Sequence, residues 1–227
     1  MQILTNKIKF PKVNQANEDG ILAIGGDLSS ERLILAYKNG IFPWFSQGEP
    51  IIWYAPEDRM VLFPNEIKIS KSTKQILKKN TFKITFNQHF EKVIYYCKNT
   101  YREGQSGTWI TNEMEQAYIK LHKLGIAKSV EIWLNDKLVG GLYGMDLQTQ
   151  NIPVFCGESM FSLVSNASKV AFIYLCKKLE KENYTLIDCQ VYNDHLASLG
   201  AREITRNKFM SYLKTVRPKN KTTPPIF

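Results

Sequence analysis

Three polar side chains stand inside two otherwise apolar segments of this sequence, where they could carry chemistry. Glu158 lies in Phe155-Cys156-Gly157-Glu158-Ser159-Met160-Phe161, and Asp188 and Gln190 lie in Leu186-Ile187-Asp188-Cys189-Gln190-Val191. An unpaired carboxylate in an apolar environment is costly, so each acid needs a partner. For Glu158 this is either a core Lys or Arg or a cation brought by a substrate. Asp188 and Gln190 form either a satisfied core network or part of a shared site.

Two predicted strands and the helix between them position these polar residues. Val154–Ser159 and Thr185–Val191 have the short apolar pattern of buried strands, and Asn166–Lys181 has the apolar spacing of a helix. Residues two apart on a strand point to the same face, so Asp188 and Gln190 are predicted to share one. If the two strands are neighbours in a sheet, Glu158 belongs to the same site.

The segments upstream continue the alternation of helix and strand. Ala127–Leu134 and Lys137–Met145 are predicted strands of a hairpin, because Asn135-Asp136 between them is a tight-turn signal. The glycines of Gly140-Gly141-Leu142-Tyr143-Gly144 predict either a bulge or a close approach of another part of the chain. The order of elements indicates a mixed α/β (α+β) fold that resembles the GNAT, or acetyltransferase-like, fold.

The chain divides into two predicted parts. Residues 1–62 are rich in Gly, Pro and aromatic residues and break into short extended pieces, which predicts a small N-terminal lobe. Residues 63–227 form the larger domain. Its tail from about residue 217 contains Pro224 and Pro225 and is predicted to be mobile.

The composition limits the cellular setting and the partners. The 227 residues carry a formal net charge of +9, which favours a polyanionic partner but is also found in ordinary Lys-rich proteins. The sequence shows no signal peptide and no apolar run long enough for a membrane span, so we expect a cytoplasmic protein that makes no membrane contact. The four cysteines form no C-x-x-C pair and the three histidines are scattered, so no metal site is expected.

One stretch concentrates positive charge. Residues 68–83 contain lysines and no acidic residue, and Ser70 or Ser72 can cap a short helix there. Lys71, Lys74 and Lys78 fall on one face of that helix. This face is either an ordinary solvated surface or a surface that binds phosphates.

Several catalytic templates are absent from the sequence. It contains neither a Walker A motif nor G-x-G-x-x-G, and Phe161 stands where G-x-S-x-G requires glycine. Residues 159–169 also lack the loop with which GNAT proteins bind the pyrophosphate of acetyl-CoA. A GNAT-like domain without this loop is expected to use another acyl donor.

Nine motifs in one order resemble the leucyl/phenylalanyl-tRNA–protein transferase family, from about Phe10 to Tyr212. They are Gly25-Gly26-Asp27-Leu28-Ser29, Gly40-Ile41-Phe42-Pro43-Trp44-Phe45, Gly107-Thr108-Trp109-Ile110, Ser129-Val130-Glu131-Ile132-Trp133, Leu138-Val139-Gly140-Gly141-Leu142-Tyr143-Gly144, Gly157-Glu158-Ser159-Met160-Phe161-Ser162, Asn166-Ala167-Ser168-Lys169, Ile187-Asp188-Cys189-Gln190-Val191 and His195-Leu196-Ala197-Ser198-Leu199-Gly200-Ala201.

The resemblance implies both a fold and an activity. The fold is a small N-terminal lobe packed on a GNAT-like domain. The activity is transfer of Leu or Phe, or less well Met, from aminoacyl-tRNA to the N-terminal amine of proteins that begin with Lys or Arg, which marks them for N-degron degradation. The resemblance implies no metal or organic cofactor, and we expect the enzyme to be a monomer.

The resemblance also assigns roles residue by residue. The predicted catalytic residues are Asp188, Gln190 and Glu158, without a decision on which acid meets the attacking amine. Trp44 and Trp109 are predicted to lie near the 3′ adenosine of the tRNA, and Leu142, Met160 and Leu175 in the pocket for the donor side chain. The tRNA contacts are predicted from the charge of the basic stretch and not from the resemblance: they are Lys68, Lys71, Lys74, Lys78 and Lys79.

The chain departs from the family pattern at two places, and two rival functions stay open. The family's Trp-Trp-Ser-Pro-Asp-Pro-Arg is Trp53-Tyr54-Ala55-Pro56-Glu57-Asp58-Arg59 here, and the loop between Gly144 and Phe155 is longer than usual. The rivals are an N-acetyltransferase that uses acetyl-CoA and a non-catalytic RNA-binding module. The second would explain the lysines and aromatics but not an acid on each of two apolar strands.

Overall fold

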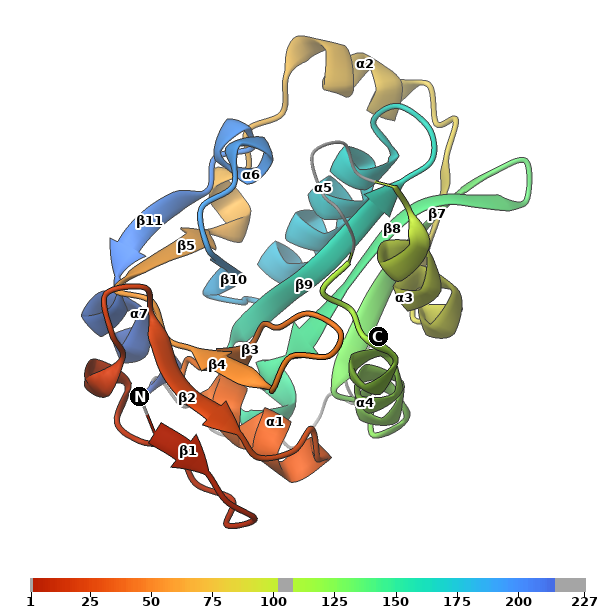
Figure 1. Cartoon of the computed structure of the whole chain (residues 1–227). Helices are drawn as coiled ribbons and strands as arrows, with labels where there is room; N and C mark the ends of the chain where they lie inside the picture. Colours follow the sequence, from red (N-terminus) through yellow and green to blue (C-terminus); the bar gives the residue numbers. More distant parts are fainter. Residues whose placement is uncertain (1, 102–107, 215–227) are drawn as a thin grey trace.

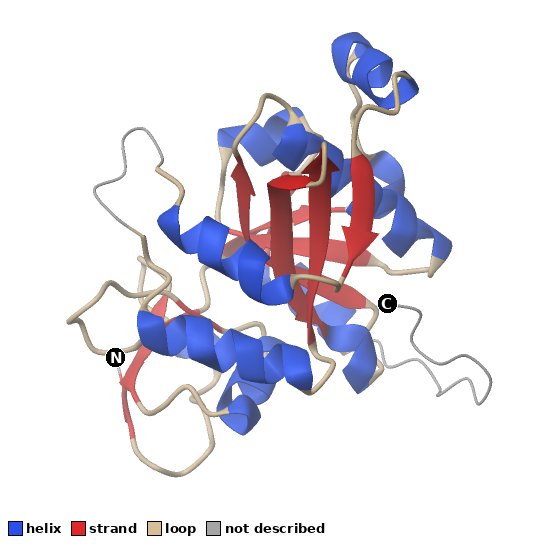
Figure 2. Ribbon diagram, turned by 90° about the vertical axis from the view of Figure 1, so that its right-hand side faces the viewer, coloured by secondary structure: helices blue, strands red, loops and turns tan. Residues whose placement is uncertain are grey.

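The computed structural model describes residues 2–101 and 108–214, which form two β-sheets with helices packed around them (Figures 1 and 2). The mixed α/β class predicted from the sequence is confirmed. The tail from about residue 217, predicted to be mobile, lies outside the described residues. No helix in the described part is both long and apolar enough to cross a membrane.

The smaller sheet is built from the N-terminal quarter of the chain. Its strand order is β1-β2-β4-β3, with bounds β1 (Gln2–Leu4), β2 (Ile21–Gly25), β3 (Phe42–Pro43) and β4 (Ile52–Tyr54). Helix α1 (Ser30–Lys38) begins after Ser29, whose hydroxyl accepts a hydrogen bond from the backbone N–H of Arg32. The chain leaves α1 through Gly40, which has a φ of +71°.

The larger sheet has the strand order β11-β5-β10-β9-β8-β7-β6. Its strands are β5 (Asp58–Leu62), β6 (Lys83–Phe86), β7 (Ala127–Leu134), β8 (Lys137–Asp146), β9 (Val154–Ser162), β10 (Leu186–Gln190) and β11 (Arg202–Thr205). The pair β9/β10 is parallel, and α5 (Ala167–Lys181) connects the two strands. This is the predicted strand–helix–strand unit. The predicted hairpin is confirmed as β7/β8, with Asn135 and Asp136 both at positive φ.

Helices cover both faces of the large sheet. Helix α5 packs against β8 and β7 on one face, while α3 (Phe90–Asn99) and α4 (Asn112–Lys123) pack on the other (Figure 1). Gly140 of β8 allows the close approach of α5, because a Cβ at this position would collide with Ala167. The close approach predicted from the glycines is therefore confirmed at this position.

The two sheets share one hydrophobic core. Leu22 and Trp53 of the small sheet belong to the same buried cluster as Tyr143 and Met145 of the large one. The predicted small lobe ran to residue 62, yet β5 (Asp58–Leu62) pairs with β10 and β11 inside the large sheet. The division into two parts stays a prediction, and we propose that the boundary lies before β5.

The described residues also contain three further α-helices and three short 3-10 helices, η1 (Val13–Gln15), η2 (Pro64–Glu66) and η3 (Leu147–Gln150). Helix α2 (Lys71–Lys78) begins after Ser70, whose hydroxyl accepts from the Thr73 backbone N–H at 3.2 Å. It lies at the edge of the molecule, at the top of Figure 1. Helices α6 (Asp194–Ser198) and α7 (Arg206–Leu213) follow β10 and β11.

Candidate active site

A pocket of about 310 Å³ opens where the two sheets meet. It lies between β3 and its continuation at Trp44, the segment before α4, strands β8, β9 and β10, and helices α5 and α6. The structure brings together in its lining seven of the predicted residues: Trp44, Trp109, Leu142, Glu158, Met160, Leu175 and Gln190.

The pocket is apolar along one wall and aromatic at its edge. Leu142, Met160 and Leu175 come from β8, β9 and α5, and Leu142 and Leu175 are almost fully buried. Trp44 is 44% exposed, so its ring is free to meet a ligand from solution. The Trp44 ring lies 5.8 Å from that of Tyr54, which holds it at the edge of the small sheet. The site therefore offers an apolar space beside an accessible aromatic surface.

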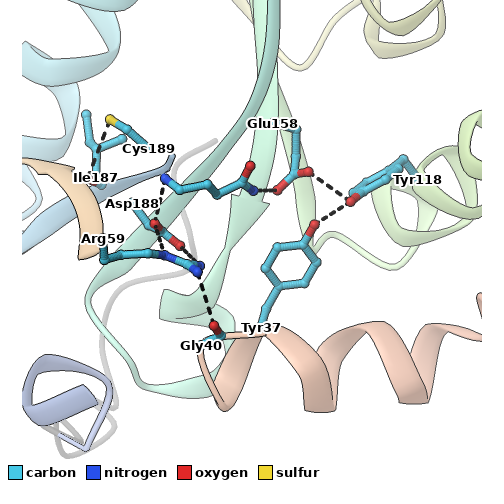
Figure 3. Close-up of polar contacts among 9 residues, drawn as sticks. Tyr37, Gly40, Arg59, Tyr118, Glu158, Ile187, Asp188 and Cys189 are labelled. Atoms are coloured by element: carbon cyan, nitrogen blue, oxygen red, sulfur yellow. Dashed lines mark hydrogen bonds and ion pairs between the residues drawn. The ribbon is translucent and has the colours of Figure 1, made fainter. Parts of the chain in front are cut away.

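Glu158 is partly exposed in this pocket and has two neutral hydrogen-bond donors. The Tyr118 hydroxyl donates to Oε2 at 2.9 Å, and the Gln190 side-chain amide donates to Oε1 at 3.0 Å (Figure 3). Within the described residues no Lys or Arg forms a salt bridge with Glu158. The structure therefore does not show the first alternative for the partner of Glu158, a salt bridge to a Lys or Arg of the core.

The surroundings of Glu158 raise its pKa from the ordinary 4.5 to about 7. Burial is the largest cause, because it penalises the charged form, and the nearby Asp188 carboxylate acts in the same direction. The hydroxyls of Tyr37 and Tyr118 and the charge of Arg59 oppose the rise. A carboxyl group with a pKa near neutrality can both hold and release a proton under working conditions.

Asp188 has a different environment, and its predicted orientation is wrong. Its carboxylate is fully buried, outside the pocket lining, and forms a two-pronged ion pair with Arg59 at 2.7 Å for each contact (Figure 3). The prediction that Asp188 and Gln190 share a face assumed a regular strand. The pairing of β10 with β5 shifts register between these two residues, and Gln190 has a φ of +65°.

The bulge in β10 explains where the Gln190 side chain goes. Because the strand is irregular there, Gln190 turns its amide into the pocket while Asp188 stays behind the lining. The backbone N–H of Gln190 donates to Asp188 Oδ1 at 2.9 Å, which holds this conformation. Asp188 thus supports the backbone that carries Gln190.

Three residues that hold the site together were not predicted from the sequence. Arg59 pairs with Asp188, Tyr118 donates to Glu158, and the Tyr37 and Tyr118 hydroxyls are hydrogen-bonded to each other. A signal for Arg59 was present: a buried acid needs a cation, and Arg59 begins the apolar run of β5. The tyrosines carried no comparable signal, because Tyr37 and Tyr118 fit the apolar stripes of α1 and α4.

The five predicted tRNA-binding lysines lie outside the pocket, on or beside α2. Lys68, Lys71, Lys74, Lys78 and Lys79 are all exposed. The Lys68 backbone N–H donates to the carbonyl oxygen of Leu199 at 2.8 Å. This bond places the start of the lysine segment beside α6, whose residues His195 and Leu196 line the pocket.

Comparison with known proteins places the chain in a family. A model described as leucyl/phenylalanyl-tRNA protein transferase matches residues 61–214, and a model of the N-terminal domain of the same family matches residues 26–57. The chain belongs to the leucyl/phenylalanyl-tRNA–protein transferase family. The resemblance found in the sequence motifs is thereby confirmed.

Relatives in this transferase family match nearly the whole chain. A protein named leucyl/phenylalanyl-tRNA–protein transferase in Flavobacterium psychrophilum is 59% identical over 214 residues, which is 94% of this chain and 100% of the relative. Proteins of the same name in Flavobacterium johnsoniae and Christiangramia forsetii are 62% and 55% identical, over 95% and 94% of this chain and 100% of each relative.

Proposed function

We propose that this protein transfers Leu or Phe, and less well Met, from aminoacyl-tRNA to the N-terminal amine of proteins that begin with Lys or Arg. Membership of the transferase family supports the reaction. The observation that carries the proposal is the convergence in one pocket of an accessible tryptophan, an apolar wall and the hydrogen-bonded pair Glu158 and Gln190. Each of these features matches one part of the two substrates.

The aromatic and apolar parts of the pocket suit the aminoacylated end of a tRNA. Trp44 and Trp109 offer π-faces on which the 3′ adenine stacks. Leu142, Met160 and Leu175 then surround the Leu, Phe or Met side chain. An apolar wall discriminates between donor side chains by their volume and branching. Each methylene-sized difference typically changes the binding free energy by about 1–3 kcal/mol.

The reaction is aminolysis of an ester that is already activated. The neutral amine attacks the ester carbonyl, the new C–N bond forms, and the bond between the carbonyl carbon and the ribose oxygen breaks. The amine proton reaches the leaving ribose oxygen. Positioning the two reactants for this attack can supply about 7–11 kcal/mol.

Gln190 and Glu158 are the groups that we assign to the amine. The Gln190 Nε2 donates to Glu158, so its Oε1 is directed elsewhere and can accept a hydrogen bond from the incoming amine. The Glu158 carboxylate adds negative charge where a cationic N-terminus arrives. We assign Asp188 to orientation of Gln190, because its own carboxylate is taken up by Arg59.

We assign binding of the tRNA body to the lysines on and beside α2. Their charge suits phosphates and carries little sequence preference. We further propose that the enzyme acts as a monomer in the cytoplasm, where charged tRNA is available, and that it marks its products for degradation.

The test is incubation with radiolabelled Leu-tRNA and peptides that begin with Arg, Lys or Ala. Label is expected on the Arg and Lys peptides and not on the Ala peptide. Parallel incubation with radiolabelled acetyl-CoA addresses the rival N-acetyltransferase. Acetyl transfer without leucyl transfer, or tRNA binding without any transfer, would contradict the proposal.

A further inference from the structure

The contacts around the candidate site form a nearly closed ring that starts and ends at the C-terminal end of α1. The ring runs from the Tyr37 hydroxyl to Tyr118, Glu158, the Gln190 side chain, the Gln190 backbone, Asp188, Arg59 and the carbonyl oxygen of Gly40 (Figure 3). Tyr37 lies in the last turn of α1 and Gly40 just beyond it. One short segment thus anchors both acids of the site.

The directions of these hydrogen bonds are fixed by their chemistry. Tyr118 donates its only proton to Glu158 Oε2, so Tyr37 must donate to the Tyr118 oxygen. Gln190 donates its amide N–H to Glu158 Oε1. Glu158 therefore accepts a hydrogen bond on each oxygen, which is the pattern of an ionised carboxylate.

The ionisation of Glu158 decides which end of the Gln190 amide faces the substrate. An ionised Glu158 accepts from Nε2 and leaves the Gln190 Oε1 for the amine. A protonated Glu158 can instead donate to Oε1, and the amide then presents its NH₂ group, which repels the N–H bonds of the amine. Loss of the carboxylate charge would thus remove the acceptor that the reaction needs.

We propose that Tyr118 is a positioning residue, which holds Glu158 as a charged acceptor and thereby fixes the orientation of the Gln190 amide, and that Tyr37 orients the Tyr118 hydroxyl. Both tyrosine side chains are fully buried and therefore held in place by packing. Tyr118 does not itself line the pocket, but it donates to Glu158, which does. The proposal deepens the proposed function and rests on it only for its kinetic consequence.

Titratable groups face Glu158 from five elements. They are Tyr37 on α1, Arg59 on β5, Tyr118 on α4, Asp188 on β10 and Cys156 on its own strand β9. Burial and Asp188 favour the neutral acid, whereas the two hydroxyls and Arg59 favour the carboxylate. Removing the Tyr118 hydroxyl subtracts a direct stabilising contact, so the pKa of Glu158 must rise.

The decisive experiment measures Glu158 directly, in the full-length protein without substrate. The ¹³C resonance of the Glu158 carboxyl group, assigned by its loss in Glu158→Gln, is followed against pH in the wild type, Tyr118→Phe and Tyr37→Phe. The pH midpoint of this titration is expected to rise by roughly 1 in Tyr118→Phe and to rise in Tyr37→Phe as well. Circular dichroism confirms that each variant is folded.

Leucyl transfer supplies the second measurement. A rise of about 1 in the pKa lowers the charged fraction of Glu158 about fivefold at pH 7. The kcat of Tyr118→Phe is therefore expected to fall by about that factor at pH 7 and to recover toward the wild type at pH 8.5, with KM for charged tRNA unchanged.

An unchanged Glu158 midpoint in folded Tyr118→Phe would overturn the proposal. An equal loss of activity at every pH would also overturn it, because it would indicate a packing role alone. Failure of the proposed function is recognised separately: the wild type would then transfer no leucine, while the carboxyl titration would still give its answer.

Discussion

At the residue scale, the two acids of the site show how environment separates chemically similar groups. Asp188 is buried beside a guanidinium that satisfies both of its oxygens, whereas Glu158 lies at the pocket with neutral donors. Burial raises the pKa of Glu158, because no salt bridge to a Lys or Arg of the described residues compensates for it. Asp188 is thus suited to hold the structure, whereas the charge of Glu158 can change near neutral pH.

The ion pair of Asp188 makes a prediction about stability. In Asp188→Asn the buried Arg59 keeps its charge and loses its partner, which typically costs about 3–5 kcal/mol. Asp58→Asn is the control, because Asp58 is exposed and adjacent to Arg59 in β5, and it is expected to change stability by less than about 0.5 kcal/mol. Urea unfolding measures both variants. Equal stability of the two would show that the pair contributes nothing.

The pKa of Glu158 makes a prediction about stability against pH. Its pKa is about 7 in the folded protein and near 4.5 when unfolded, so the folded state binds the proton more tightly. The stabilisation from the neutral acid is full below about pH 4.5 and is lost as the pH rises to about 7. Relative to Glu158→Gln, the free energy of unfolding of the wild type is expected to fall by on the order of 2–3 kcal/mol over this pH range. The unfolding free energies of the two proteins are measured by urea unfolding at several pH values. A difference between them that does not change with pH would contradict this prediction.

At the element scale, the pattern of apolar residues predicted strands and helices well, and irregularities less well. β9, α5 and β10 follow from their apolar spacing, and the β7/β8 hairpin follows from Asn135-Asp136. The bulge in β10 does not, because it arises from pairing with β5, a strand more than a hundred residues away in the sequence. That bulge decides that Gln190, and not Asp188, lines the pocket.

Helix α2 makes a prediction about tRNA binding. The variant Lys71→Gln/Lys74→Gln/Lys78→Gln removes three exposed charges from one helix. If each contacts a phosphate, the slope of log K against log salt should become shallower by about 2–3. The control Lys38→Gln/Lys120→Gln/Lys123→Gln removes the same charge from α1 and α4, far from α2 in Figure 1. Equal slopes for the two variants would place the tRNA elsewhere.

At the scale of the whole molecule, the site depends on contacts that no local pattern contains. The motifs of the sequence correctly indicated the family, and seven of the residues that they singled out line the pocket. They did not indicate Tyr37, Arg59 or Tyr118, because a tyrosine or an arginine at the edge of an apolar pattern has many possible partners. Tertiary structure selects those partners, because α1, α4 and β5 are brought to β9 and β10 by the fold and not by proximity in the sequence.

The shared core and the ring of polar contacts predict that the two sheets unfold together. Small-sheet residues Leu22 and Trp53 are buried with Tyr143 of the large sheet, and Arg59 bonds both Asp188 and the Gly40 carbonyl. Separating the sheets would expose this core and leave buried polar groups unpaired. Hydrogen exchange should therefore give the same opening free energy for amides in β2 and in β8. A much lower value for β2 would mean that the small sheet opens alone, and Trp44 would then leave the pocket without global unfolding.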